Sequence, residues 1–532
     1  MRFSKKCASF ALVLAIAAAG RPAAAQDPSA PVRRVSVDEA VNLALEQNLG
    51  IAVERFNPQI DDMSIAQARS FWLPTLSSTL QGVSQDSPVT SALAGGQTAI
   101  TDNRFTTQVG MSQILPFGTS YSLAWNGARS TSSNLFTNYN PLLNSYVSLN
   151  VTQPLLRNRT IDQYREQLEL TRKQRDASDL SLDATVVTTV RNVKNAYWDL
   201  VYTRENLRAQ QQALDLAKRA LADNEKRVQI GTMAPIDIVE AQSEVARNEE
   251  AVIVAESDIK QAEDRLRALI FDPKTPDFWT NVIEPTDAMT FQPYAVDVDA
   301  AVRQALDVRS DVKLAKNTIE QNEVSLKYYK GQTLPEVNAN LNYQSNGAGG
   351  TILAPITSFP PVTANRPVLS ERGFGTVLGD VFTSQYPAWT FGVSVSYPVG
   401  DSTQQTNLSR ATLQYQQAQT QLRSLELQIA TQVRDAGRSV VTNMKRVDSA
   451  RAARDLAEQR LAAEEKKFAA GIQISFFVFQ AQRDLATART AEIKAIADYN
   501  KSIVDFEALQ KASVLGTNPT TITSTALTTG RR

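Results

Sequence analysis

Two stretches of this chain carry the same repeating pattern. Residues 193–231 read VKNAYWDLVYTRENLRAQQQALDLAKRALADNEKRVQIG, and residues 433–471 read VRDAGRSVVTNMKRVDSARAARDLAEQRLAAEEKKFAAG. Every seventh residue is apolar in the first stretch, and only Arg454 breaks the same pattern in the second. A heptad repeat of this length predicts helices that supercoil against partner helices. The repeated positions are Val193, Leu200, Leu207, Leu214, Leu221 and Val228, and Val433, Val440, Val447, Arg454, Leu461 and Phe468.

The first of these helices extends well beyond its heptads. The helical pattern covers residues 161–230, which at ~1.5 Å per residue is roughly 105 Å, so the helix must project from any compact core. Gly231 and Gly471 are the glycines expected just past a helix C-terminus. Another helical pattern follows each glycine. The sequence therefore predicts two antiparallel helical hairpins, at 161–270 and 402–513.

The two hairpins belong to a longer internal duplication. An offset of 261 residues aligns the pattern VDxAVxxAL at 37–45 with 298–306, and it carries Leu73-Pro74 onto Leu334-Pro335. An offset of 240 aligns Gly231 with Gly471, with 10 identities in 28 positions. Chance similarity between alanine-rich helices does not explain the shared glycine or the shared Leu-Pro.

Each repeat is expected to begin with a short amphipathic helix and a second helix that ends before Leu-Pro. Pro58 should kink or interrupt that second helix in the first repeat only. The expected segments are a signal peptide at 1–25, a first repeat at 26–270, a linker at 271–296, a second repeat at 297–515 and a disordered tail at 516–532.

Between the short and long helices lie segments that alternate with period two. Val337, Ala339, Leu341 and Tyr343 alternate with asparagine and glutamine, and residues 391–397 alternate aromatic or β-branched residues with glycine and serine. This pattern predicts strands of a sheet that has one apolar and one polar face. Outer-membrane barrels show such faces, although a half-buried soluble sheet also does. Strands are expected within 75–153 and 336–397.

The first strand region is the longer of the two. Leu80 to Pro154 spans 74 residues and the matching interval Leu341 to Pro398 spans 57, a difference of 17. Alternating segments at 105–112 and 120–126 flank the turn signal Leu115-Pro116-Phe117-Gly118. We therefore expect four strands in the first repeat and two in the second. The alternative is an extracellular hairpin, which leaves four strands per chain.

Composition limits the remaining classes of function. The chain has 55 basic and 55 acidic residues, no His, and one Cys, Cys7. Without His, the commonest general base and metal ligand is missing, and no pair of acids stands out as a hydrolase site. We expect no enzyme, cofactor or metal site. The balanced charge argues against a nucleic-acid partner.

The N-terminus predicts export. Basic residues at 2–6, an apolar run at 10–19 and Ala23-Ala24-Ala25 form a signal peptide cleaved after Ala25. No later stretch reaches the ~18–20 apolar residues of a membrane helix. Any membrane crossing must therefore use strands in a closed barrel. The fold class expected is a mixed α/β membrane protein with four to six strands per chain.

The signal peptide, the duplicated order of helices, strands and helical hairpin, the Leu-Pro before each first strand and the glycine turns together resemble the TolC-type outer-membrane efflux proteins. The resemblance extends from about Val35 to Leu515. It implies a homotrimer that shares one barrel in outer-membrane lipid and one periplasmic helical tunnel. It also implies that the tips at Gly231 and Gly471 dock a periplasmic adaptor protein and an inner-membrane pump, for export of drugs, metals or proteins.

Two departures from the family concern the closed entrance of the tunnel. Family members often carry acidic residues six and nine positions after the second tip glycine, but here these positions are Phe477 and Gln480. Their first-repeat equivalents are Asp237 and Glu240. These two acids either line a constriction or complement the dipole of a helix N-terminus. The phenylalanines at 476, 477 and 479 either close the pore or pack inside the hairpin.

One competing class of protein fits part of the pattern. An exported coiled-coil structural or adhesive surface protein without a pore would explain the heptads and the signal peptide. It does not explain alternating strands inserted at matching places in both repeats. A porin is less suitable still, because porins lack helices of roughly 100 Å.

Overall fold

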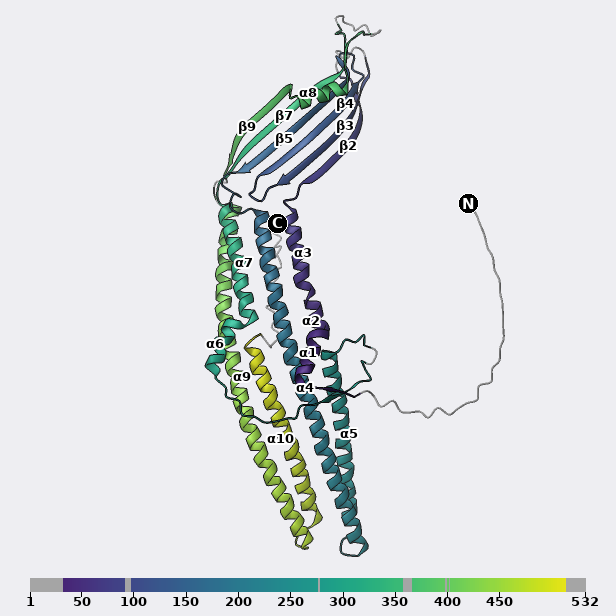
Figure 1. Cartoon of the computed structure of the whole chain (residues 1–532), viewed down its shortest axis with the longest axis vertical. Helices are drawn as coiled ribbons and strands as arrows, with labels where there is room; N and C mark the ends of the chain where they lie inside the picture. The colour runs from purple at the N-terminus through teal and green to yellow at the C-terminus, as the bar shows by residue number, and fades with distance from the viewer. Residues whose placement is uncertain are drawn as a thin grey trace, which may run out of the picture.

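The computed structural model describes residues 32–90, 97–275, 278–356, 366–397, 400 and 402–512. The expected signal peptide and tail lie outside the described residues. A sheet occupies one end of an elongated molecule, and long helices extend from it to the opposite end (Figure 1).

The first half begins with short elements, continues into four strands and ends with a helical hairpin. Its elements are β1 (Val32–Val35), α1 (Val37–Gln47), α2 (Leu49–Glu54), α3 (Phe56–Ser70), β2 (Thr75–Pro88), β3 (Ala99–Ile114), β4 (Ser120–Ser132), β5 (Tyr139–Pro154), α4 (Gln163–Gln229) and α5 (Ile236–Ile270).

The second half follows the same plan after a connecting segment. The connecting segment contains β6 (Val282–Pro285). The elements of the second half are α6 (Val298–Val308), α7 (Ser310–Gln332), β7 (Glu336–Leu353), β8 (Val368–Arg372), α8 (Phe374–Phe382), β9 (Tyr386–Ser396), α9 (Thr403–Ala469) and α10 (Ser475–Leu509).

The two long helices have equal lengths. α4 and α9 each contain 67 residues, which corresponds to ~100 Å. α5 and α10 return antiparallel to them, so both predicted hairpins are confirmed (Figure 1). Near the sheet, α3 packs on α4 while α7 packs on both α9 and α4. α10 also packs on α4, where Arg191 donates to Asp505 and Gln210 donates to Thr490. No helix within the described part of the chain is long and apolar enough to cross a membrane.

The helices that lead into the sheet differ between the halves. In the first half the chain breaks at Arg55, between α2 and α3, and Pro58 lies in the first turn of α3. There its missing N–H has no helical partner to lose. The equivalent α7 is a single helix of 23 residues. The predicted interruption in the first half alone is confirmed.

The sheet joins the two halves. Its order is β2-β3-β4-β5-β7-β9, with every pair antiparallel, and β5 and β7 make the contact between the halves. The predicted segments 105–112 and 120–126 lie in β3 and β4, and both strands are paired on both sides. The short strand β8, which was not predicted, pairs with the far end of β7. The described sheet thus contains six long strands and one short strand.

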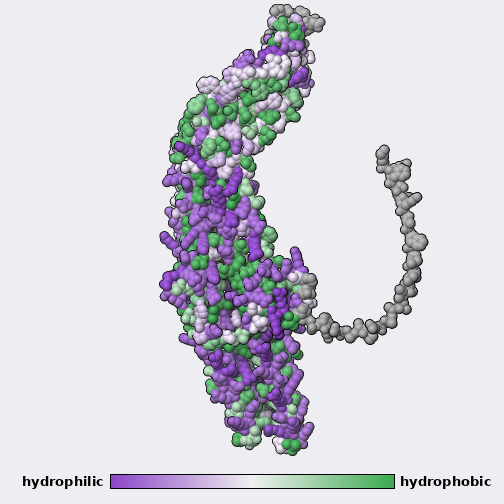
Figure 2. All heavy atoms as spheres, in the orientation of Figure 1, coloured by the Kyte–Doolittle hydropathy of each residue, from purple (hydrophilic) through white to green (hydrophobic). Residues whose placement is uncertain are grey.

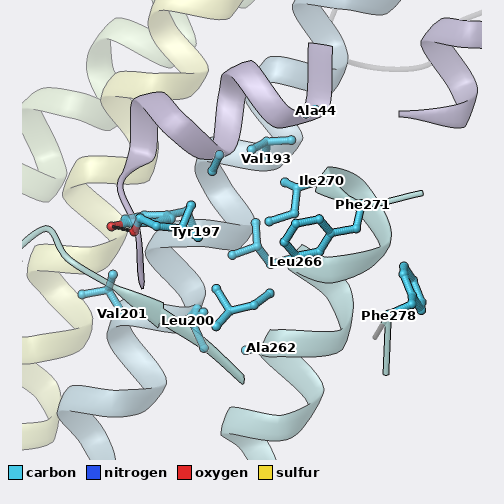
Figure 3. Packing of buried hydrophobic residues seen from close by; sticks show 13 residues of the cluster. Ala44, Val193, Tyr197, Leu200, Val201, Ala262, Leu266, Ile270, Phe271 and Phe278 are labelled. Atoms are coloured by element: carbon cyan, nitrogen blue, oxygen red, sulfur yellow. Dashed lines mark hydrogen bonds between the residues drawn. The ribbon is translucent and has the colours of Figure 1, made fainter. Parts of the chain in front are cut away.

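A second pairing, also not predicted, holds the middle of the molecule. β1 pairs in parallel with β6, which lies between the halves in sequence. Beneath it, a core from α1, α4 and α5 includes Val193, Tyr197, Leu200 and Leu266 (Figure 3). The matching core of the second half contains Val433, Val440, Val447 and Tyr499. The part of the helices around these two cores is called the equator below.

Two tyrosines hold the segment between the halves against the equator. The hydroxyl of Tyr197 donates to Asp287 Oδ2 at 2.8 Å and accepts from the Asp287 N–H at 3.1 Å. Burial, followed by the neighbouring Asp287, raises the pKa of Tyr197 to about 12. The hydroxyl of Tyr499 donates to the Gln292 carbonyl at 2.7 Å and accepts from the Tyr294 N–H at 2.9 Å.

Candidate functional site

The sheet separates side chains into two faces. One register row crosses all six long strands with apolar or aromatic residues, and we call this side the apolar face. Because side chains alternate along a strand, the row three residues further along β2 lies on the opposite side, the polar face. The apolar row is Leu76, Met111, Leu123, Leu149, Tyr343 and Trp389, and the polar row is Thr79, Gln108, Asn126, Tyr146, Asn346 and Tyr386.

The apolar face is exposed in the single chain. Trp389 is 72% exposed and Val395 is 68% exposed, and several of their neighbours are equally accessible. In a space-filling view, hydrophobic residues gather over the sheet whereas hydrophilic residues cover most of the helical part (Figure 2). The two faces predicted from the alternating sequence are therefore confirmed.

The polar face is linked by side-chain amides. Asn342 donates to Asn150 at 2.6 Å, Asn150 donates to the Ser122 hydroxyl at 3.3 Å, and Asn340 donates to the Ser394 hydroxyl at 3.1 Å. Further along the strands the face is hollowed around Arg104 and Asn126. Amides and hydroxyls are polar groups that cost free energy to bury, so this face suits contact with water rather than a buried core.

The two hairpin tips have the same backbone geometry. Gly231 and Gly471 have φ values of +77° and +74°. At each tip the glycine N–H bonds the carbonyl three residues back, and the next N–H bonds the carbonyl five residues back. This is the Schellman arrangement, which needs a residue with positive φ and so favours glycine. The predicted helix ends are confirmed.

The other predicted tip residues lie just beyond these turns. Asp237 is in the first turn of α5, and Asp237 and Glu240 are both partly exposed. In α10, Phe477 is 40% exposed and contacts the ring of Phe476, whereas Phe479 is 3% exposed. The interpretation that all three phenylalanines pack inside the hairpin is therefore wrong for Phe476 and Phe477. Gln480 is partly exposed.

Contacts between the hairpins were not foreseen from the sequence. The Ser475 hydroxyl donates to Asp237 at 3.1 Å. Further from the tips, Arg483 of α10 pairs at 3.0 Å with Glu244 of α5, which is 5% exposed. A buried carboxylate needs such a partner. No short sequence motif could have predicted this pair, because its members are 239 residues apart.

Solved structures of outer-membrane channels share the fold, among them CmeC, VceC and MtrE. The outer membrane channel CmeC of Campylobacter jejuni matches with a TM-score of 0.63 and 14% identity, covering 89% of this chain and 85% of that one. The outer membrane protein VceC of Vibrio cholerae matches with a TM-score of 0.60 and 15% identity, covering 90% of this chain and 96% of that one. The open state of the outer membrane channel MtrE of Neisseria gonorrhoeae matches with a TM-score of 0.60 and 16% identity, covering 90% of this chain and 89% of that one. Among curated protein sequences, none matches this chain.

An antiparallel sheet with two unlike faces, continued by two long helical hairpins, defines a channel-type outer-membrane protein. The sequence model of the family described as outer membrane efflux protein matches residues 40–270 and 301–510. The chain belongs to this family. It is an efflux channel of the outer membrane with a large periplasmic part, as the resemblance implied. The family is one of transport channels rather than enzymes, and the adhesive alternative is not favoured.

Proposed function

We propose that three copies of this chain close into one barrel and one helical tunnel, through which cargo leaves the periplasm. The main support for this proposal is that the sheet of the single chain has two open edges. Within the described residues, β2 pairs only with β3, and β9 pairs only with β7. Long open edges are a hazard unless they are covered or paired. Cyclic symmetry pairs the β2 of one copy with the β9 of the next.

Six long strands per chain give roughly 18 in the trimer, within the even-numbered range of bacterial barrels. In this arrangement the apolar face contacts outer-membrane lipid and the polar face surrounds the water-filled channel. The hydrogen-bonded amides of Asn342, Asn150 and Asn340 then line its wall. Transport through such a wall needs no cofactor and no bound metal.

The helices have an analogous need for partners. Toward the tips Leu207 and Leu214 remain partly exposed in the single chain, although they continue the heptad of Leu200. A neighbouring copy would cover them and complete the supercoil. The two repeats, 26–270 and 297–515, would each contribute one hairpin to a ring of six, with the signal peptide 1–25 removed on export.

We place adaptor docking and gating at the tips. The turns at Gly231 and Gly471 would contact the periplasmic adaptor, which connects to the inner-membrane pump. Asp237, Glu240, Phe477 and Gln480 lie one to three turns beyond them and would form the constriction. Contacts between the hairpins, such as that of Ser475 with Asp237, would hold the closed state.

The first test is the assembled protein itself. Material extracted from outer membranes in mild detergent should be a trimer and should conduct ions in planar bilayers. A monodisperse monomer that retains full helicity would contradict the proposal. Discrete trimers without conductance would favour an adhesive function.

The gate can be tested with paired phenylalanine variants. Phe477→Ala should raise the conductance of closed trimers, because its ring is accessible at the tip. Phe479→Ala is the matched control, since Phe479 packs inside the hairpin and its loss should lower stability instead. Unchanged conductance in Phe477→Ala would remove this residue from the proposed constriction.

A further inference from the structure

We propose that α8 is an interfacial anchor that lies in the outer leaflet of the membrane, against lipid acyl chains, on the outside of the barrel. This inference rests on the proposed function, because it needs the apolar face of the sheet to contact lipid. Nothing in the duplicated sequence plan requires a helix here. α8 is an insertion between β8 and β9, and both of these strands pair with β7.

α8 lies across the sheet near the end far from the long helices, where it packs on β7 and β5 (Figure 1). The residues beneath it continue the alternation of Leu341 and Tyr343 along β7, at Ser345, Gly347 and Gly349. A Cβ at Gly347 would clash with the carbonyl oxygen of Val377, and one at Gly349 would clash with its side chain. The glycines of β7 therefore make room for this helix.

Polar contacts fix the helix in place. The Ser345 hydroxyl donates to the Val381 carbonyl at 2.6 Å, and the Tyr343 hydroxyl donates to Ser384 at 2.9 Å. Asp380, the single charged residue of α8, is buried and pairs with Arg372 at 2.6 Å. The charge of the helix is thus satisfied internally.

The exposed side of α8 is unlike that of a helix in water. Val377, Asp380 and Val381 are buried, whereas the exposed residues of the helix are Phe374, Thr376, two glycines and Phe382, which is 76% exposed, so the exposed side carries no charge. An amphipathic helix in water would show charged residues there, whereas a helix that is apolar all round is buried or in lipid. Nine residues with two glycines would also be marginal in water.

The position of α8 along β7 matches a membrane boundary. From Val337 to Gly347 is ten residues, or ~33 Å of strand, which at the usual tilt is about 25 Å along the barrel axis. The apolar band of such barrels is also ~25 Å tall. Aromatic residues gather at this level, where Trp125 and Phe374 stack edge to face at 6.4 Å. Aromatic girdles mark the edges of the apolar band.

Lipid is the occupant that the observations favour. The exposed side of α8 is continuous with the apolar face, where Trp389 lies a short distance along β9. A protein partner at the outer rim would be expected to use charges on this side, and α8 has none exposed. Acyl chains need only apolar area, which Phe374, Leu378 and Phe382 provide.

Nitroxide labels can test this placement in the assembled trimer. Cys7, the single cysteine of the sequence, lies in the signal peptide that is removed on export, so a cysteine introduced at Phe382 is the single labelling site of the assembled trimer. In vesicles of phosphatidylethanolamine and phosphatidylglycerol, collisions of the label with dissolved oxygen and with a water-soluble nickel chelate are compared. The ratio of oxygen to nickel collisions should be severalfold higher for Phe382→Cys than for Asn346→Cys on the polar face.

Two other results at Phe382 would overturn the inference. A label that collides mainly with the nickel chelate would place α8 in water. An immobile label that is protected from both reagents would place α8 against a neighbouring protomer. Circular dichroism and native gels establish that each labelled variant is folded and trimeric before it is compared.

A label at Val395→Cys separates this inference from the proposed function. Val395 lies on the apolar face of β9, far from α8, and is 68% exposed. If the label at Val395 is in lipid and that at Phe382 is in water, only the role of α8 fails. If the label at Val395 is in water, the proposed orientation of the barrel fails as well.

Discussion

The equator and the tips of the same two helices use one heptad pattern in different ways. At the equator Leu200 and Val440 are fully buried within the chain. Nearer the tips Leu207 and Leu214 continue the pattern, yet they are partly exposed. At the equator α1 packs on α4, α6 packs on α9, and the β1–β6 pair packs on α4 and α5. The tips have only the hairpins. The heptad side chains are therefore buried within one chain at the equator, whereas nearer the tips they need neighbouring chains to cover them.

The largest expected effect is loss of folding after a substitution in the equatorial core. Val440→Asp places an unpaired charge in the equatorial core, which costs several kcal/mol out of the ~5–15 kcal/mol of a typical protein. We expect loss of the folded chain, measured as loss of helical circular dichroism and of detergent-soluble protein. Thr442→Asp, on the exposed side of α9, is the control. Equal helicity in both variants would contradict a self-sufficient equator.

The next effect is on assembly rather than folding. The double variant Leu207→Asp with Leu214→Asp should keep its helicity but lose the trimer, because these side chains are only partly covered in one chain. Light scattering after size-exclusion chromatography measures the mass. Gln211→Asp, exposed on the same helix, is the matched control. A stable trimer in the double variant would show that these positions are not buried between copies.

A pH effect on stability is expected from Tyr197 at the equator. Because burial raises the pKa of Tyr197 to about 12, above the ordinary value of 10, folding favours its neutral form. This stabilisation is complete below pH 10 and is lost as pH rises toward 12. It amounts to about 2–3 kcal/mol. The decrease in melting temperature between pH 10 and 12 should be smaller in Tyr197→Phe. An identical decrease would show that Tyr197 titrates normally.

The smallest effect on stability is expected at the tips. Gly231→Val and Gly471→Val each force a β-branched residue into positive φ, although a new Cβ would meet no atom within 4 Å. The strain of about 1–3 kcal/mol falls on the turn alone. Export should decrease while trimers still insert in the membrane. Gly331→Val is the control, because Gly331 has an ordinary φ and a new Cβ there would make only an ordinary contact of 3.9 Å with Ile161. Normal export by both tip variants would argue against docking at these turns.

Patterns that repeat locally could be interpreted without coordinates. The heptads predicted α4 and α9, the glycines predicted their ends, and the alternation of residues 105–126 predicted β3 and β4. In each case the signal lies within a few residues, because helix and strand periods are set by the backbone. The role of Gly231 and Gly471 in docking stays a prediction, since adaptor contacts are absent from the chain itself.

The sequence by itself determined the long helices, the turns at their ends and the two faces of the sheet. Only the tertiary structure decided which side chains meet: Arg483 with Glu244, Val35 of β1 with the strand β6, and α8 with the glycines of β7. It also decided that Phe477 is exposed whereas Phe479 is buried. The physical reason is sequence separation. Periodicity fixes the direction of a side chain from its own element, but a contact depends on how elements that are far apart in the chain pack together.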